Sequence, residues 1–316
     1  MLNSVFSRSL AAAACVLALA GSASAAEPAS CKTVRFSDVG WTDISATTGL
    51  TSRILTGLGY EPKLQVLSVP VTYASLKNKD IDVFLGNWLP SMAADLKPYQ
   101  DDGSVEVVGV NLEGAKYTLA VPNYLFDEGL KTFADIAKFK DKLGGKLYGI
   151  EPGNDGNRLI LDMIKSDKFG LGSFELVESS EQGMLAQVDR AGRKKDAIVF
   201  LGWAPHPMNE KFQMQYLDGG DDVFGPNFGG ATVSTSVRKG YVEECPNVGA
   251  LLKNMKFTLP IEGQVMASIL DDGKEPLAAA EAWLKANPGQ IDTWLAGVST
   301  IDGQPGADAV KKSLGL

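Results

Sequence analysis

The 316-residue chain is predicted to be an α/β protein with two lobes, each built on a mixed sheet with flanking helices. Short runs of β-branched and apolar residues alternate with segments of helical period along most of the chain. This alternation is typical of sheets covered by helices. About 290 residues remain after an N-terminal export signal, which is more than one hydrophobic core usually organises, so two lobes are expected.

The first 26 residues have the features of an export signal. Arg8 precedes an apolar stretch at residues 10–20, and small residues follow it as far as Ala26. The stretch is shorter than the roughly 18 residues that a membrane-spanning helix needs. We therefore expect residues 1–26 to be a cleaved signal peptide and the mature chain to be exported. A lipid anchor at Cys15 is the weaker alternative, because this residue lies inside the apolar core of the signal.

The pattern of apolar residues predicts the elements in chain order. In the first part of the chain we expect strands at 33–37, 63–67, 81–85 and 105–108, and helices at 44–58 and 71–78. In the middle part we expect strands at 117–121, 148–150, 175–177 and 197–201, and helices at 133–139, 158–166 and 182–190. In the last part we expect helices at 261–270 and 276–287.

Two glycine-containing segments, 109–116 and 218–230, are expected to cross between the lobes, since glycine absorbs large backbone changes at little steric cost. Lobe one would then consist of residues 27–115 and 221–316, and lobe two of residues 116–220.

The mature chain keeps two cysteines, Cys31 and Cys245, in an oxidising compartment. A disulfide between them is the simplest interpretation, and two buried free thiols are the alternative. With the crossings placed as above, both cysteines belong to lobe one.

The formal net charge of −8 and the absence of a basic stripe argue against a nucleic-acid or anionic-lipid partner. The only histidine is His206, and no nucleophile, metal or nucleotide motif is found. We therefore expect no catalytic residue, no metal and no cofactor. An exported enzyme that uses a pair of carboxylates is the minority alternative.

Three β-branched runs end at a glycine and a tryptophan, which gives Trp41, Trp88 and Trp203. In open α/β proteins the ligand crevice lies beyond the carboxyl ends of the strands, so these rings are candidates for a site. Aromatic faces recognise quaternary ammonium cations, which have no N–H to donate. Tyr117, next to the presumed hinge, is a fourth candidate. The alternative is that each ring fills the core of a lobe.

Two polar positions accompany the rings. Asp43 would offset the charge of a cation, which favours choline over the zwitterion glycine betaine. Alternatively it caps the helix that begins near Ile44. Asn154 precedes a predicted helix and would bond a ligand hydroxyl or carboxylate, with Asp155 as a further possible ligand residue. The alternative there is an ordinary turn and helix cap, and a calcium loop is disfavoured because EF-hand spacing is missing.

Segments 39–43, 87–90, 151–154 and 202–207, together with Tyr117, resemble choline-binding members of the glycine betaine and proline betaine substrate-binding family of bacterial ABC importers. The resemblance implies a type II periplasmic binding protein fold with a ligand cleft between the lobes. It implies an aromatic box of Trp41, Trp88, Tyr117 and Trp203, with Asp43 near the ammonium and Asn154 near the ligand hydroxyl.

The resemblance also implies the Cys31–Cys245 disulfide, a periplasmic location and delivery of the ligand to a membrane permease. Choline is the expected ligand, with acetylcholine and glycine betaine weaker, and the protein is expected to be a monomer. Two alternatives remain: a binding protein for glycine betaine or a related osmolyte, and an exported enzyme acting on a choline ester.

Overall fold

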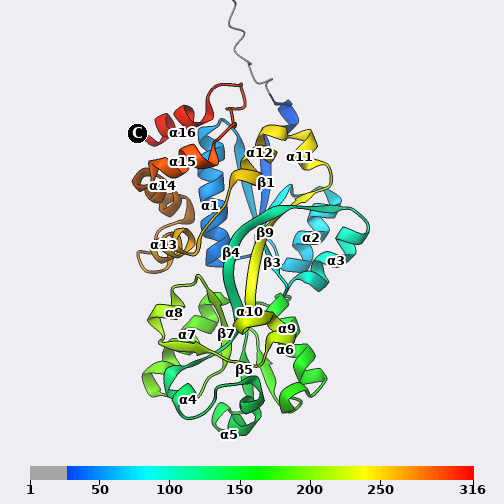
Figure 1. Cartoon of the computed structure of the whole chain (residues 1–316), viewed down its shortest axis with the longest axis vertical. Coiled ribbons are helices and arrows are strands. Elements are labelled where there is room, and N and C mark those ends of the chain that lie inside the picture. Colours follow the sequence, from blue (N-terminus) through cyan, green and yellow to red (C-terminus); the bar gives the residue numbers. More distant parts are fainter. Residues whose placement is uncertain (1–26) are drawn as a thin grey trace, which may run out of the picture.

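The computed structural model describes residues 27–316, so the predicted signal peptide lies outside the described residues. Two lobes lie one above the other, and two long strands, β4 (Val105–Pro122) and β9 (Gly230–Arg238), run between them (Figure 1). The predicted two-lobed α/β architecture is thus confirmed. No helix within residues 27–316 has the length and apolar character needed to cross a membrane.

One mixed sheet runs through both lobes. Its strands follow the order β2-β1-β3-β9-β4-β7-β5-β6, and β8 pairs with β4. β1 pairs in parallel with β2 and β3, whereas β9 is antiparallel to both β3 and β4. The remaining strands are β1 (Thr33–Asp38), β2 (Glu61–Val66), β3 (Val83–Leu89), β5 (Lys146–Tyr148), β6 (Glu175–Val177), β7 (Phe200–Ala204) and β8 (Met214–Tyr216).

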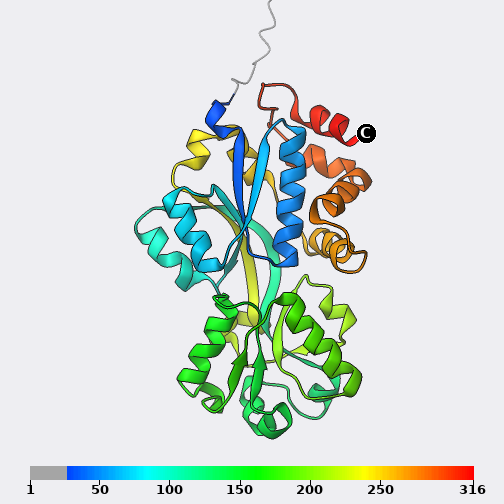
Figure 2. The same ribbon diagram turned by 180° about the vertical axis from the view of Figure 1, so that it is seen from behind.

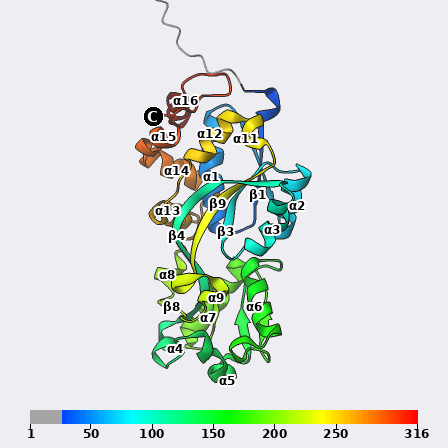
Figure 3. The same ribbon diagram turned by 45° about the vertical axis from the view of Figure 1, so that its right-hand side comes forward.

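Strand β4 belongs to the sheets of both lobes. From Val105 to Lys116 it pairs with β9, and from Lys116 to Pro122 it pairs with β7 and β8. The prediction of two separate strands at 105–108 and 117–121 is therefore wrong. Three register shifts fall between residues 107 and 115, so the strand bulges where glycines interrupt the apolar pattern but its pairing continues. Figure 3 shows β4 and β9 running together between the lobes.

The segment at 218–230 also differs from the expected irregular connection. It contains two short helices, α9 (Asp221–Phe224) and α10 (Pro226–Gly229), and leads directly into β9. Strand β9 was not predicted from the sequence, because its middle residues Ser234, Thr235 and Ser236 are polar although they are buried.

Lobe one, the upper lobe in Figure 1, is covered by helices from both ends of the chain. Helix α1 lies between the sheet and the C-terminal helices, as Figure 2 shows from behind. A side chain at Gly49 would come within 2.9 Å of the carbonyl oxygen of Pro276, so this glycine permits the close contact of α1 with α14. The helices are α1 (Thr42–Gly57), α2 (Val69–Asn78), α3 (Ala93–Asp101), α11 (Tyr241–Glu244), α12 (Pro246–Asn254), α13 (Leu259–Leu270), α14 (Pro276–Ala286), α15 (Pro288–Trp294) and α16 (Gly306–Leu314).

Lobe two, the lower lobe in Figure 1, carries α6 and α7, whose N-termini are capped by Asn154 and Ser180. The helix expected at 133–139 is a 3₁₀ helix, and the strand expected at 197–201 begins three residues later, at Phe200. The α-helices of this lobe are α4 (Asn123–Asp127), α5 (Lys140–Leu143), α6 (Asp155–Lys165), α7 (Glu181–Lys194) and α8 (Met208–Lys211).

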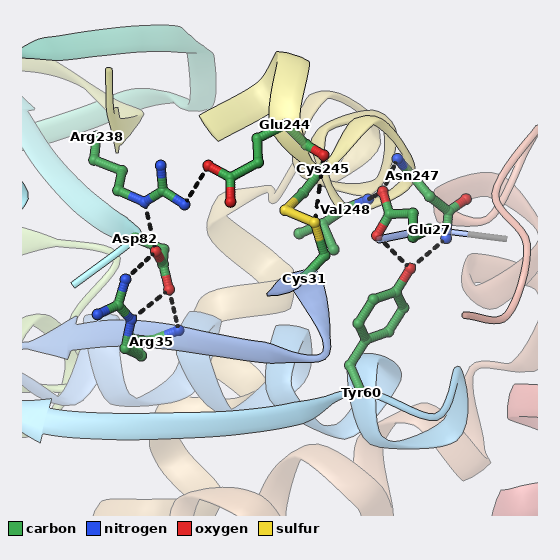
Figure 4. The surroundings of a disulfide bond; sticks show 10 residues. All are labelled: Glu27, Cys31, Arg35, Tyr60, Asp82, Arg238, Glu244, Cys245, Asn247 and Val248. Atoms are coloured by element: carbon green, nitrogen blue, oxygen red, sulfur yellow. Dashed lines mark hydrogen bonds and ion pairs between the residues drawn. A yellow bond between two sulfur atoms is a disulfide. The ribbon is translucent and has the colours of Figure 1, made fainter. Parts of the chain in front are cut away.

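The predicted disulfide between Cys31 and Cys245 is present, with a Cα–Cα distance of 5.6 Å (Figure 4). Beside it, the carboxylate of Asp82 accepts hydrogen bonds from the guanidinium groups of Arg35 and Arg238. These arginines hold the pKa of Asp82 below its ordinary value against the opposing effect of burial. The disulfide and the ion pairs together tie β1, β3, β9 and the start of α12 into one unit of lobe one.

Candidate functional site

A small cavity lies where the two lobes meet. All the aromatic and polar residues that the sequence singled out as ligand candidates line it, and Ile150 adds an apolar wall that was not predicted. The lining residues are Trp41, Asp43, Trp88, Tyr117, Ile150, Asn154, Asp155 and Trp203. The structure therefore brings the candidates together, from β3, β4, β7 and the starts of α1 and α6.

The aromatic wall is centred on Tyr117. Its ring centroid lies 5.9 Å from that of Trp88 and 6.2 Å from that of Trp203. Tyr117 and Trp203 are directly opposite each other on β4 and β7, which places both side chains on the same face of the sheet. Together with Trp41, each of these rings is at most 6 % exposed. The four rings are therefore shielded from solvent and form walls of the cavity.

Asp43 is a buried carboxyl group of the site, with 1 % of its surface exposed. Its Oδ2 accepts a hydrogen bond from the indole N–H of Trp88 at 3.1 Å, and within residues 27–316 its Oδ1 has no hydrogen-bond partner. Burial, with the nearby charge of Glu181, raises the pKa of Asp43 to about 8. The capping alternative is wrong, because Trp41 occupies the N-cap position of α1 and the Asp43 side chain bonds Trp88 instead.

Asn154 does cap a helix, as the alternative interpretation expected. Its Oδ1 accepts from the backbone N–H of Asn157 at 3.0 Å, and it also accepts from the hydroxyl of Tyr117 at 2.9 Å. A side chain at Gly156 would come within 2.1 Å of the Tyr117 hydroxyl oxygen, so only glycine permits this approach. Asn154 therefore caps α6 and at the same time forms part of the cavity wall.

Asp155 brings a second carboxylate to the cavity. Its Oδ1 accepts from the amide N–H₂ of Asn154 at 3.2 Å, whereas its Oδ2 is buried and has no partner in the described part of the chain. Burial raises the pKa of Asp155 to about 6. Behind the aromatic wall, Glu151 accepts from the indole N–H of Trp41 at 2.8 Å, and burial raises its pKa to about 7.

Among the described residues, no Lys, Arg or His lines the cavity. The site combines aromatic faces, which carry negative quadrupole potential, with two buried carboxylates that lack full hydrogen bonding. Such a site stabilises a cation and disfavours an anion. An uncompensated buried carboxylate is costly, so a cation bound beside it would stabilise the ionised form of these groups.

Contacts across the lobe interface surround the cavity and were not foreseen from the sequence. Besides the Trp41–Glu151 bond, Arg158 of α6 donates to Asp95 of α3 at 2.7 Å, and Thr42 of α1 donates to Glu181 of α7. These partners are far apart in the chain, and no local motif marks them. Their only signal in the sequence is that Thr42 adjoins Trp41 and that Glu181 begins a helix.

The chain matches solved structures of binding proteins over nearly its whole described length. It is 64 % identical to an ABC-transporter choline binding protein in complex with choline, covering 91 % of this chain and 100 % of that chain, with a TM-score of 0.90. The unliganded, semi-closed form of an ABC-transporter choline binding protein gives the same identity and coverage but a TM-score of 0.84. Lactococcal OpuAC, closed around glycine betaine, is 26 % identical, covering 83 % of this chain and 99 % of that chain, with a TM-score of 0.75.

These neighbours are substrate-binding proteins of transporters, and they share the two-lobed type II periplasmic binding protein fold predicted from the sequence. The family model for the substrate-binding domain of the ABC-type glycine betaine transport system, OpuAC, matches residues 32–286. The chain therefore belongs to the OpuAC family of substrate-binding domains.

Proposed function

We propose that this protein captures choline between its two lobes and delivers it to the membrane permease of an ABC importer. The observation that carries the proposal is the cavity itself: four aromatic rings and the unpartnered Oδ1 of Asp43, with no basic residue among the described lining. A quaternary ammonium group donates no conventional hydrogen bond, so aromatic faces and a carboxylate suit it best. The 64 % identity to a choline-binding protein supports the same ligand.

Each lining residue then has a role. Trp41, Trp88, Tyr117 and Trp203 contact the methyl groups, and Asp43 offsets the positive charge. Asn154, whose amide already faces Tyr117 and Asp155, hydrogen-bonds the choline hydroxyl. Each ring contributes about 0.5–2 kcal/mol when desolvated.

Choline is favoured over glycine betaine because of charge. Betaine carries its own carboxylate, which in this cavity would stand near Asp43 and Asp155 with no basic side chain to receive it. The repulsion between these like charges opposes the binding of betaine. Glycine betaine, as in the related lactococcal protein, is nevertheless the second candidate ligand.

Ligand capture is proposed to close the lobes about β4 and β9. Lobe one would be residues 27–115 and 221–316, and lobe two residues 116–220, because β4 changes its pairing partners at Lys116. The higher TM-score with the choline complex than with the semi-closed form supports a closed arrangement in this structure. The ligand would shift the population toward the closed form that the permease recognises.

We further propose that the protein works in the periplasm as a monomer after removal of residues 1–26, and that it is not an enzyme. Membership of a family of substrate-binding domains supports both the location and the absence of turnover.

Titration with choline, followed by intrinsic tryptophan fluorescence, tests the proposal, because three of the five tryptophans line the cavity. We expect saturable quenching or a spectral shift with choline and a weaker response with acetylcholine. No response to choline, with a response to betaine, would favour the osmolyte alternative. Turnover of a choline ester that disappears on substitution of one carboxylate would favour the enzyme alternative.

A further inference from the structure

A buried carboxylate bridges the two lobes beside the cavity. Glu181 is the first residue of α7 in lobe two, and Thr42 is the first residue of α1 in lobe one. The backbone N–H of Thr42 donates to Oε2 of Glu181 at 2.8 Å, and the Thr42 hydroxyl donates to Oε1. Glu181 is 1 % exposed and Thr42 is 4 % exposed. The backbone N–H at the start of α1 thus donates its hydrogen bond to a residue of the opposite lobe.

His206 supplies the third hydrogen bond to Glu181. Its Nδ1 accepts from the backbone N–H of Met208 at 2.9 Å, which leaves the proton of the neutral ring on Nε2. Nε2 then donates to Oε1 of Glu181 at 3.2 Å. The His206 ring also packs edge-on against Trp203, with centroids 4.8 Å apart. The acceptor for α1 is therefore held in place by a side chain that touches the cavity wall.

Thr42 stands between two residues of the cavity, Trp41 and Asp43. Fixing the backbone of Thr42 fixes the first turn of α1, from which both of these side chains project. Glu181 itself does not line the cavity. Its three hydrogen bonds join α1 of lobe one to α7 and to the segment between β7 and α8 in lobe two, and separating the lobes would break those to Thr42.

We propose that Glu181 is a positioning residue that latches the closed form: it accepts the N-terminus of α1 from across the cleft and thereby sets Trp41 and Asp43 around the ligand. The proposal rests on the proposed function, capture of choline by closure of the lobes. A hydrogen bond to a buried charged group is stronger than one between neutral groups.

The ion pair of Arg158 and Asp95, which also crosses the interface, is a weaker candidate for this role. Arg158 and Asp95 have 32 % and 16 % of their side chains exposed, so solvent screens the pair. Asp95→Asn therefore serves as a control: it weakens a contact between the lobes without touching the hydrogen bonds of Glu181.

Thr42→Val is the main test, because it removes one hydrogen bond to Glu181 and keeps the volume and the backbone N–H. We expect choline to bind about tenfold more weakly, through faster dissociation, with the thermal unfolding of the ligand-free protein unchanged. Thr51→Val is the matched control. Thr51 is buried in the same helix, but its hydroxyl donates to Thr47 within α1 at 2.8 Å, so its loss should leave choline affinity unchanged.

Glu181→Gln is the second test. Glutamine has only one acceptor oxygen. Its amide nitrogen must therefore face either the backbone N–H of Thr42 or the Thr42 hydroxyl and the Nε2–H of His206. We expect a loss of affinity at least as large as for Thr42→Val. Combining the two substitutions should cost less than the sum of the single losses, because both remove the same interaction.

Wild-type affinity and dissociation rate in both variants would overturn the proposal, as would a loss of affinity that only follows a loss of ligand-free stability. Failure of the wild type to bind choline would refute the proposed function instead. The latch would still be tested by X-ray scattering of the ligand-free proteins. Glu181→Gln should have a larger radius of gyration than Thr51→Val, and equal radii would refute the latch.

Discussion

The indole N–H of Trp88 donates to Oδ2 of Asp43 at 3.1 Å, so the charged group of the cavity and one of its aromatic walls are fixed to each other. The other oxygen of Asp43 is buried and without a partner among residues 27–316. The hydrogen bond orients the two side chains relative to each other. Oδ1 of Asp43 therefore remains available for a cation, and so does the face of the Trp88 ring, because the hydrogen bond uses only its N–H.

Asp43→Asn should weaken choline binding by tenfold or more and affect glycine betaine less. The substitution keeps the shape of the side chain and removes its charge, whose attraction to a cation about 4 Å away is about 4 kcal/mol at an effective dielectric near 20, before desolvation is subtracted. Calorimetric titration of the variant with both ligands measures the difference. Equal losses for the two ligands would show that the charge of Asp43 does not select between them.

Acid should favour the closed form of the ligand-free protein. In this structure, which we propose to be the closed form, the pKa of Asp43 is raised to about 8, and those of Glu151 and Asp155 are raised to about 7 and 6. An exposed carboxyl has a pKa near 4, so the closed form binds more protons than the open form between about pH 4 and pH 8. Closing therefore becomes less favourable as the pH rises through this range.

X-ray scattering of the ligand-free protein at pH 5 and pH 8 checks this dependence. We expect a smaller radius of gyration at pH 5, and a smaller difference between the two pH values for Asp43→Asn, which has lost one of the titrating groups. A more open protein at pH 5 would contradict the assigned direction.

Trp203→Ala should weaken choline binding by about tenfold or more, equivalent to about 1.4 kcal/mol, and leave the protein folded, because Trp203 lines the cavity. Trp294→Ala is the contrasting substitution. Trp294 is fully buried in lobe one and donates to the carbonyl of Lys256 at 3.1 Å. Its loss should lower the free energy of unfolding by about 3–5 kcal/mol without changing the affinity of the folded protein.

Chemical denaturation and choline titration of the two variants separate these roles. Trp203 would belong to the core of lobe two if its variant unfolded with no selective loss of affinity.

Replacing Cys31 and Cys245 together by alanine should lower the free energy of unfolding by about 2–5 kcal/mol. The disulfide closes a segment of 214 residues, and it lies beside the Asp82 ion pairs rather than among the residues of the cavity (Figure 4). Choline affinity should therefore stay within about twofold of the wild type. A large loss of affinity in a folded variant would indicate coupling between the disulfide and the site.

The sequence predicts the parts of this protein whose pattern is local. Trp88 and Trp203 were expected at strand ends because each follows a β-branched run and a glycine, directly for Trp203 and after Asn87 for Trp88, and both lie in the last two residues of their strands. The helices α1, α6 and α7 were expected within a few residues of their observed bounds. Asn154 was expected as a ligand residue from its place before a predicted helix, and the resemblance to a known family assigned it to the ligand hydroxyl.

The elements that were missed depend on tertiary structure. Strand β9 is buried between β3 and β4, so its serines and threonines have no alternation to reveal them. Strand β4 continues through its glycines because β9 pairs along it. The bond from Thr42 to Glu181 joins residues 139 positions apart on different lobes, so only the tertiary structure brings them together.

Calorimetric titration of the mature protein with choline and with glycine betaine, at the same pH and ionic strength, tests the central claim most directly. The claim is that an aromatic cavity with buried carboxylates and no basic residue in its described lining selects a cation over a zwitterion. It predicts that choline binds at least tenfold more tightly than betaine. Tighter binding of betaine, or no binding of choline, would contradict it.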